Sequence, residues 1–245
     1  GLSEICFSGP EEELVRTEHA QPAIYLVGWV ALQLLREQAP SLAFDATAGL
    51  SLGEFTALAA ADALGFEDGL RVVRRRGEVM QHACEASAGG MAAIVGLDEE
   101  VVHDVCGQAG VSLANLNCPG QIVISGDADK MEAACDAAKA AGAKRAIPLP
   151  VAGAYHSPLM QPAQAGLAEA LAKVELREPS LPVYSNVTGQ AHAAAGTIAD
   201  TMVDQVTSPV KWEACIRAMI AAGITRFIEL GPGKALSGFM RRIDR

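Results

Sequence analysis

Gly49, Ser51 and Gly53 form the pattern Gly-x-Ser-x-Gly, which is typical of a nucleophile elbow. In such an elbow the serine lies on a sharp turn between a strand and a helix, and its hydroxyl is raised to the edge of a sheet. Segment 44–48 before the motif predicts a short buried strand, and the Ala- and Leu-rich segment 52–61 predicts the start of a helix. Because both flanks fit, we favour a catalytic serine at Ser51 over a chance glycine turn.

A serine hydroxyl is a poor nucleophile unless a base takes its proton. Among the five histidines, His156 has the most suitable context, because it lies in loop 153–160 directly before a predicted helix start at Ser157 and Pro158. We therefore expect His156 to be the base. The other four lie in polar or helical surroundings that are typical of surface or packing residues: His19, His82, His103 and His192.

No acidic residue stands out as the third group that would fix the imidazole tautomer. Asp200, Asp204 and Glu229 are candidates, but surface or capping roles suit them better.

Arg76 closes the basic run 74–76 and falls at the edge of the apolar face of a predicted helix over 70–83. An arginine in that position needs an anionic partner. Two partners remain open, a structural carboxylate and a substrate carboxylate, and a guanidinium binds either with two hydrogen bonds.

The elements that must position these residues follow from apolar periodicity: helices over 21–38 and 70–83, and short strands over 182–186 and 226–230. Residues 89–150 have a different rhythm and predict the order β-α-β-β-α-β, the split βαβ arrangement. We therefore expect an α/β fold in two domains. The large domain is discontinuous (1–88 and 151–245), and the small domain (89–150) is inserted into it.

The composition excludes several classes of protein. The formal net charge of −10 disfavours nucleic-acid binding. No run of 18 or more apolar residues predicts a membrane span, and no secretory signal is visible. The cysteines are scattered without a Cys-x-x-Cys pair, which indicates reduced thiols in the cytoplasm and neither a disulfide framework nor a zinc site. They are Cys6, Cys84, Cys106, Cys118, Cys135 and Cys215.

Six motifs occur in order along the chain, at 49–54, 76–81, 117–121, 153–160, 209–212 and 229–233. Together they closely resemble the malonyl-CoA:acyl carrier protein transacylases of bacterial fatty acid synthesis, whose relatives include the acyltransferase domains of polyketide synthases. The resemblance runs along essentially the whole chain. It implies an α/β-hydrolase-like large domain with a ferredoxin-like insert, which agrees with the rhythm described above.

The resemblance also implies a ping-pong acyl transfer without a cofactor or a metal. Ser51 would attack the thioester of malonyl-CoA while His156 takes its proton, and coenzyme A would leave. The phosphopantetheine thiol of acyl carrier protein would then collect the malonyl group. A cytoplasmic location is expected, with neither nucleic acid nor a membrane as a partner.

Further roles follow from the same motifs. Arg76 matches the arginine that holds the malonyl carboxylate, and the backbone amide of Leu52 would supply half of the oxyanion hole. In this family a backbone carbonyl, not an acid, orients the histidine, and the matching position is Lys211.

Three other positions match the family's cleft. Gln21 matches a glutamine near the site, and Asn117 matches an asparagine that lines the cleft. Tyr155 fills the place of a bulky ring that accompanies malonyl over methylmalonyl, so we expect a preference for malonyl.

Two departures from the family pattern are visible. Leu50 stands where the family usually has a histidine before the nucleophile. The family also begins with a strand ending in Gly-Gln-Gly-Ser-Gln, which supplies the other oxyanion donor and which this sequence lacks. We therefore expect a chain without its N-terminal strand and with weak activity, because loss of one such donor typically costs roughly 10²–10³ in rate.

Two alternative functions remain. A serine hydrolase on the same elbow is disfavoured by Arg76, which suits a free carboxylate on the acyl group. A non-catalytic module that binds carrier protein is disfavoured by the joint presence of Ser51, Arg76 and His156.

Overall fold

A computed structural model describes residues 1–244 of the chain. The helices are α1 (Leu2–Ser8), α2 (Glu11–Leu14), α3 (Thr17–Gln38), α4 (Gly53–Ala60), α5 (Phe66–Ala86), α6 (Glu99–Ala109), α7 (Ala128–Ala140), α8 (Gln161–Leu171), α9 (Ala195–Asp204), α10 (Trp212–Ala221) and α11 (Ala235–Ile243), with a 3₁₀ turn at Pro158–Met160. The strands are β1 (Thr47–Ala48), β2 (Gly89–Val95), β3 (Ser112–Cys118), β4 (Gln121–Asp127), β5 (Arg145–Pro148) and β6 (Val183–Tyr184). The fold is therefore mixed α/β, as expected.

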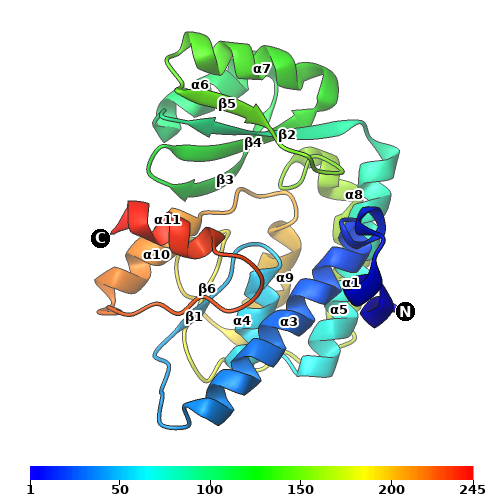
Figure 1. Ribbon diagram of the computed structural model, residues 1–245, viewed down its shortest axis with the longest axis vertical. Coiled ribbons are helices and arrows are strands. Elements are labelled where there is room, and N and C mark those ends of the chain that lie inside the picture. Colours follow the sequence, from blue (N-terminus) through cyan, green and yellow to red (C-terminus); the bar gives the residue numbers. More distant parts are fainter. Residues whose placement is uncertain (245) are drawn as a thin grey trace.

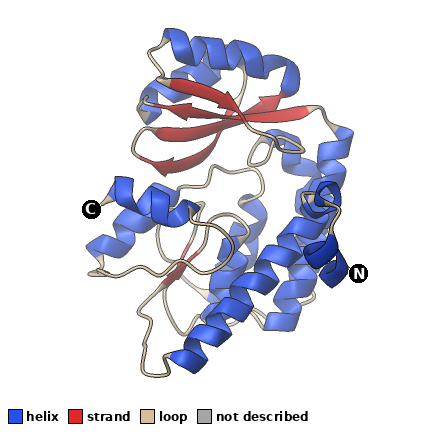
Figure 2. Ribbon diagram, viewed as in Figure 1, coloured by secondary structure: helices blue, strands red, loops and turns tan. Residues whose placement is uncertain are grey.

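The larger sheet is antiparallel and has the strand order β3-β4-β2-β5. Helices α6 and α7 cover one of its faces, and Figure 2 shows its strands grouped at one end of the molecule. Ile94 and Ile124 are buried beneath the helices against Val102 and Ala134. The order β-α-β-β-α-β predicted for 89–150 is the order observed.

The second sheet is a parallel pair in which Thr47 and Ala48 of β1 lie beside Val183 and Tyr184 of β6. Both strands are shorter than predicted. The strand predicted over 226–230 is not formed within the described chain, and this prediction is wrong. An extended segment becomes a strand only when a neighbour completes its hydrogen-bond ladder, and no described backbone group pairs with residues 226–230.

Helices α3 and α5 pack side by side and flank the elbow region (Figure 1). Both are longer than predicted. Helix α3 begins at Thr17, because the side-chain oxygen of Gln81 in α5 accepts a hydrogen bond from the Thr17 backbone N–H. This contact satisfies one of the first N–H groups of the helix. Apolar periodicity cannot predict it, because Gln81 is far from Thr17 in the sequence.

None of the helices in residues 1–244 is long and apolar enough to cross a membrane. The six cysteines are free, and all except Cys6 are buried.

Candidate active site

Ser51 lies on a sharp turn between β1 and α4 and has a positive φ of 52°, which is strained for a residue with a side chain. A Cβ added to Gly49 would come within 1.9 Å of the carbonyl carbon of Gly53, whereas a Cβ on Gly53 would meet nothing within 4 Å. The first glycine of the motif is therefore required by the close approach of two backbone segments. The second contributes its backbone to that approach and needs no extra room.

The hydroxyl of Ser51 lies between two groups from distant parts of the chain. Its Oγ is 2.9 Å from Nε2 of His156, and Nη2 of Arg76 donates to the same oxygen at 3.1 Å. His156 precedes the 3₁₀ turn, and Arg76 projects from the middle of α5. The two residues that the sequence predicted to act with Ser51 thus both contact its hydroxyl.

The carbonyl oxygen of Gln205, which directly follows α9, accepts a hydrogen bond from Nδ1 of His156 at 2.9 Å. The expectation that Lys211 supplies this carbonyl is wrong. Lys211 is the N-cap of α10, so its carbonyl accepts the N–H of Cys215 in the first helical turn, and its own N–H donates to Asn186. With Nδ1 protonated and bound to Gln205, Nε2 is left free to accept the proton of Ser51.

Burial shifts the pKa values of both groups that face Ser51. Burial and, to a lesser extent, the positive charge of Arg76 together lower the pKa of His156 to about 4. Burial also lowers the pKa of Arg76 to about 10, against the opposing effect of the Glu54 carboxylate. At neutral pH, therefore, His156 is a neutral base and Arg76 is a cation.

Arg76 is only 1% exposed, yet it forms no salt bridge with the described residues. Its two terminal nitrogens donate to the side-chain oxygens of Gln21 at 2.6 Å and Gln205 at 3.0 Å, and its carbon Cζ lies 5.6 Å from the centre of the Phe55 ring. Its Nε is buried without a partner. Of the two partners left open by the sequence, the structural carboxylate is absent from the contacts of Arg76 in residues 1–244.

Four residues behind the elbow were not selected from the sequence. Asn186 accepts the Ser51 N–H and donates to the Gly49 carbonyl, and so holds the backbone that leads into the serine. Gln205 bridges Arg76 and the Ser51 carbonyl. Glu54 and His192 form a buried pair, so the expectation of a surface or packing role for His192 misses a specific hydrogen bond. None of these contacts has a sequence signal, because each joins segments more than a hundred residues apart.

The remaining predicted site residues differ in their placement. The backbone N–H of Leu52, directly after the serine, donates to no described group. Tyr155 lines the same cavity as the serine. Asn117 does not line that cavity; it is buried with its side-chain oxygen unpaired, and Asn115 is on the cavity wall instead. The pairing of β3 with β4 shifts register between Leu116 and Cys118, so the regular alternation of side chains that would give Asn115 and Asn117 the same environment does not hold there.

The His156 ring is hydrogen-bonded to Ser51 and to the Gln205 carbonyl, and it forms no hydrogen bond or ion pair with Asp200, Asp204 or Glu229. Glu229 caps α11, since its carboxylate accepts the backbone N–H groups of Leu236 and Ser237. The capping role that the sequence favoured for Glu229 is confirmed.

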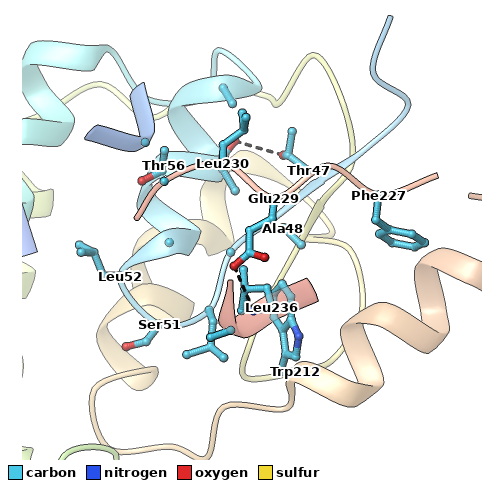
Figure 3. A pocket seen from close by; sticks show the side chains of 18 of the residues that line it. Thr47, Ala48, Ser51, Leu52, Thr56, Trp212, Phe227, Glu229, Leu230 and Leu236 are labelled. Atoms are coloured by element: carbon cyan, nitrogen blue, oxygen red, sulfur yellow. Dashed lines mark hydrogen bonds between the residues drawn. The ribbon is translucent and has the colours of Figure 1, made fainter. Parts of the chain in front are cut away.

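The site residues open onto one cavity of about 1160 Å³. Figure 3 shows Ser51 and Leu52 toward one side of it and Phe227 and Trp212 toward the other, with Glu229 above Leu236. Gln21, Arg76, Tyr155 and His156 also line it. A ligand of moderate size would reach the serine, the base and the arginine together.

Comparison with known proteins gives a consistent result. The family model described as an acyl transferase domain matches residues 1–241. The malonyl CoA-acyl carrier protein transacylase of Bacillus subtilis is 45% identical over all of this chain and 78% of its own length, and that of Escherichia coli K12 is 43% identical over 96% of this chain and 77% of its own.

Solved structures agree with the sequence comparison. A chain of the solved structure described as a type II PKS acyl-carrier protein in complex with its malonyl-transacylase matches with a TM-score of 0.94 and 38% identity. The match covers 99% of this chain and 79% of that chain. The acyl-carrier-protein S-malonyltransferase of Bartonella henselae matches with a TM-score of 0.94 and 39% identity over the same shares. With the family model matched along nearly the whole chain, the chain belongs to the acyl transferase domain family.

Proposed function

We propose that this chain transfers a malonyl group from malonyl-CoA to the phosphopantetheine thiol of acyl carrier protein, as in fatty acid biosynthesis. The observation that carries the proposal is the position of the Ser51 hydroxyl, held between the neutral base His156 and the buried cation Arg76. The curated relatives and the solved complex with a carrier protein support it.

In the first half-reaction, Ser51 Oγ attacks the thioester carbon of malonyl-CoA and its proton passes to Nε2 of His156. The backbone N–H of Leu52 stabilises the negative charge that develops on the carbonyl oxygen. The carbon–sulfur bond breaks, and coenzyme A leaves as a thiol with the proton from His156. In the second half-reaction the carrier thiol gives its proton to His156 and attacks the malonyl ester, and Ser51 recovers the proton. No cofactor is needed.

Arg76 binds the free carboxylate of the malonyl group. Its guanidinium contacts the side-chain oxygens of Gln21 and Gln205, the Ser51 hydroxyl and the Phe55 ring, and these neutral groups compensate a buried cation less well than a carboxylate does. The entry of a malonyl carboxylate therefore gives this cation its strongest partner. A serine hydrolase of uncharged esters would have no use for this cation, and a docking module would have no use for the serine and its base.

The proposal extends to the domain organisation. Residues 89–150, with the sheet order β3-β4-β2-β5 and two helices on one face, are assigned as a ferredoxin-like insert. Residues 1–88 and 151–245 are assigned as a large α/β-hydrolase-like domain. The parallel β1–β6 pair and the strained serine turn between β1 and α4 support this assignment.

The decisive experiment is intact-mass analysis after exposure to malonyl-CoA. The wild-type chain should gain one malonyl group, and Ser51→Ala should gain none. Arg76→Ala should acylate at least about 100-fold more slowly, because a charge-assisted bidentate contact is lost.

Arg75→Ala is the matched control, because Arg75 is the adjacent arginine, points outward and pairs with Glu78. It should acylate like the wild type. An equal adduct on the Ser51→Ala chain would remove the proposed nucleophile, and equal rates for Arg76→Ala and the wild type would remove the carboxylate clamp.

A further inference from the structure

Behind the serine turn, Glu54 and His192 form a pair that is enclosed by protein. We propose that Glu54, held in place by His192, is a positioning residue that fixes the reacting serine through Asn186 and Gln205. This inference deepens the proposed function, because it concerns how the same site is held in its reactive geometry.

The pair is almost completely buried. The side chain of Glu54 is 0% exposed and that of His192 is 2% exposed, and Oε1 of Glu54 lies 2.8 Å from Nε2 of His192. His192 is itself anchored, because its backbone N–H donates to Val183 in β6. A carboxylate without solvent must find donors in the protein, and His192 supplies the donor for one of its two oxygens.

The other oxygen of Glu54 serves two residues that hold the elbow. Oε2 accepts the backbone N–H of Asn186 at 3.0 Å. The side chain of Asn186 then accepts the Ser51 N–H and donates to the Gly49 carbonyl at 2.8 Å. This first path connects Glu54 to the backbone that leads into the nucleophile.

The second path runs through Gln205. Oε2 of Glu54 accepts from Nε2 of Gln205 at 2.7 Å, and the same nitrogen donates to the Ser51 carbonyl at 3.1 Å. A carboxylate only accepts hydrogen bonds, so it obliges Gln205 to direct its amide nitrogen inward and its oxygen toward Arg76. The backbone oxygen of Gln205 meanwhile orients His156.

The chemistry of the pair explains why a carboxylate occupies this position. Glu54 receives three donors on two oxygens, and a glutamine in its place would keep only one acceptor oxygen. Its negative charge also opposes the effect of burial on the pKa of Arg76. Loss of the carboxylate or of its anchor should therefore displace the serine, the base and the arginine together.

Three variants test the proposal. Glu54→Gln keeps the volume and removes the charge. His192→Leu removes the donor to Glu54, and His192→Gln keeps a donor at about the same reach. His103→Leu, at an exposed position on α6, is the control. Each folded variant is measured for thermal stability, for the rate of malonyl adduct formation, and for the rate at which a serine-directed fluorophosphonate labels Ser51.

The fluorophosphonate carries no carboxylate, so its rate reports the serine and its base without any contribution from malonate binding. Glu54→Gln and His192→Leu should label about 10- to 100-fold more slowly, the scale expected for a displaced reacting group. His192→Gln should recover most of the wild-type rate, and His103→Leu should match it. If His192 served only in packing, the hydrogen-bond donor retained in His192→Gln would not restore the labelling rate.

Wild-type labelling rates in folded Glu54→Gln and His192→Leu, with only the melting temperature lowered, would overturn the proposal. Equal loss in His192→Leu and His192→Gln would do the same. If the wild-type chain takes the fluorophosphonate but no malonyl group, the proposed function fails. The labelling rates of the variants then still decide whether the pair positions Ser51.

Discussion

At the scale of single residues, the Ser51 hydroxyl has one neighbour that accepts its hydrogen bond and one that donates a hydrogen bond to it. His156 accepts its proton, while Arg76 donates to its oxygen. The arginine therefore favours the deprotonated oxygen and also makes a charged imidazole less favourable. Both effects come from one buried positive charge, so the proposed carboxylate clamp also affects the proposed base.

The shifted pKa of His156 predicts the acid limb of Ser51 reactivity. The base works when it is neutral, so labelling of Ser51 by a fluorophosphonate should persist below the ordinary histidine pKa of 6.5 and should fall only near pH 4. In Arg76→Ala one cause of the lowered pKa is absent, so the acid limb should move to higher pH. Arg75→Ala should leave it in place. An acid limb at the same pH in Arg76→Ala and the wild type would contradict the assignment.

The same shift affects stability with a definite sign. The unfolded chain takes up the histidine proton below its pKa of 6.5, whereas the folded chain resists it until about 4. The contribution of His156 to stability is therefore present above this window and is lost as the pH falls through it.

Tyr155 predicts selectivity for the acyl group. It borders the cavity and packs against two hydrophobic clusters, one that includes Leu52 and one that includes Met91. We expect the wild type to prefer malonyl-CoA over methylmalonyl-CoA by about 10- to 200-fold, the range that one methyl group provides in a close-fitting pocket. Tyr155→Val should reduce this ratio, and Tyr155→Phe should preserve it. Competition assays with both thioesters measure the ratio, and comparable turnover by the wild type would refute a crowded pocket.

At the scale of elements, the serine turn depends on how closely the end of β1 approaches the start of α4. Only Gly49 has no room for a side chain there. We expect Gly49→Ala to abolish Ser51 acylation and lower the melting temperature, because the backbone must open. Gly53→Ala should keep activity and gain up to about 1 kcal/mol in helix propensity.

Thermal unfolding and intact-mass acylation compare these two glycines directly. Because they are symmetrical in the sequence motif, equal behaviour of the two variants would show that the turn is not organised by this contact.

Helices α3 and α5 form the other element-scale feature of the site. A Cβ on Gly77 would lie 2.7 Å from the Thr17 carbonyl oxygen, so the two helices touch at backbone distance. This contact brings Gln21 of α3 onto Arg76 of α5. Gly77, next to Arg76 in α5, therefore determines how closely Gln21 approaches Arg76.

At the scale of the whole molecule, the four-stranded sheet is tied to the segment that carries the histidine's carbonyl partner. Val210 donates to Ala114 at 2.8 Å and accepts from Leu116 at 2.9 Å, so strand β3 holds the chain shortly after Gln205. The small sheet thus helps to position a residue of the serine site.

The distribution of surface charge predicts which basic residues contribute to binding of the carrier protein. The net charge of −10 would repel a carrier protein that is itself acidic, so local basic residues would have to attract such a carrier. Arg71 and Arg74 already form ion pairs with neighbouring acids, whereas Arg241, at the cavity, forms none with the described residues.

We therefore expect Arg241→Glu to slow transfer from the preformed malonyl enzyme to carrier protein by about tenfold at low salt, with a weaker salt dependence. Arg74→Glu should have little effect. Transfer rates measured across a salt series would contradict this assignment if the two reversals behaved alike.

The sequence alone singled out the candidate nucleophile, the candidate base, the arginine and the order of the elements in residues 89–150, because each leaves a local mark. Ser51 lies between spaced glycines, His156 precedes a helix start, Arg76 sits at the edge of an apolar face, and strand and helix periods differ. Tertiary structure alone decided which carbonyl orients His156, and that Asn186, Gln205, Glu54 and His192 support the serine. Such hydrogen bonds depend on how segments that are distant in the sequence come together in the fold. Neither the neighbouring residues in the chain nor a short sequence motif specifies that arrangement.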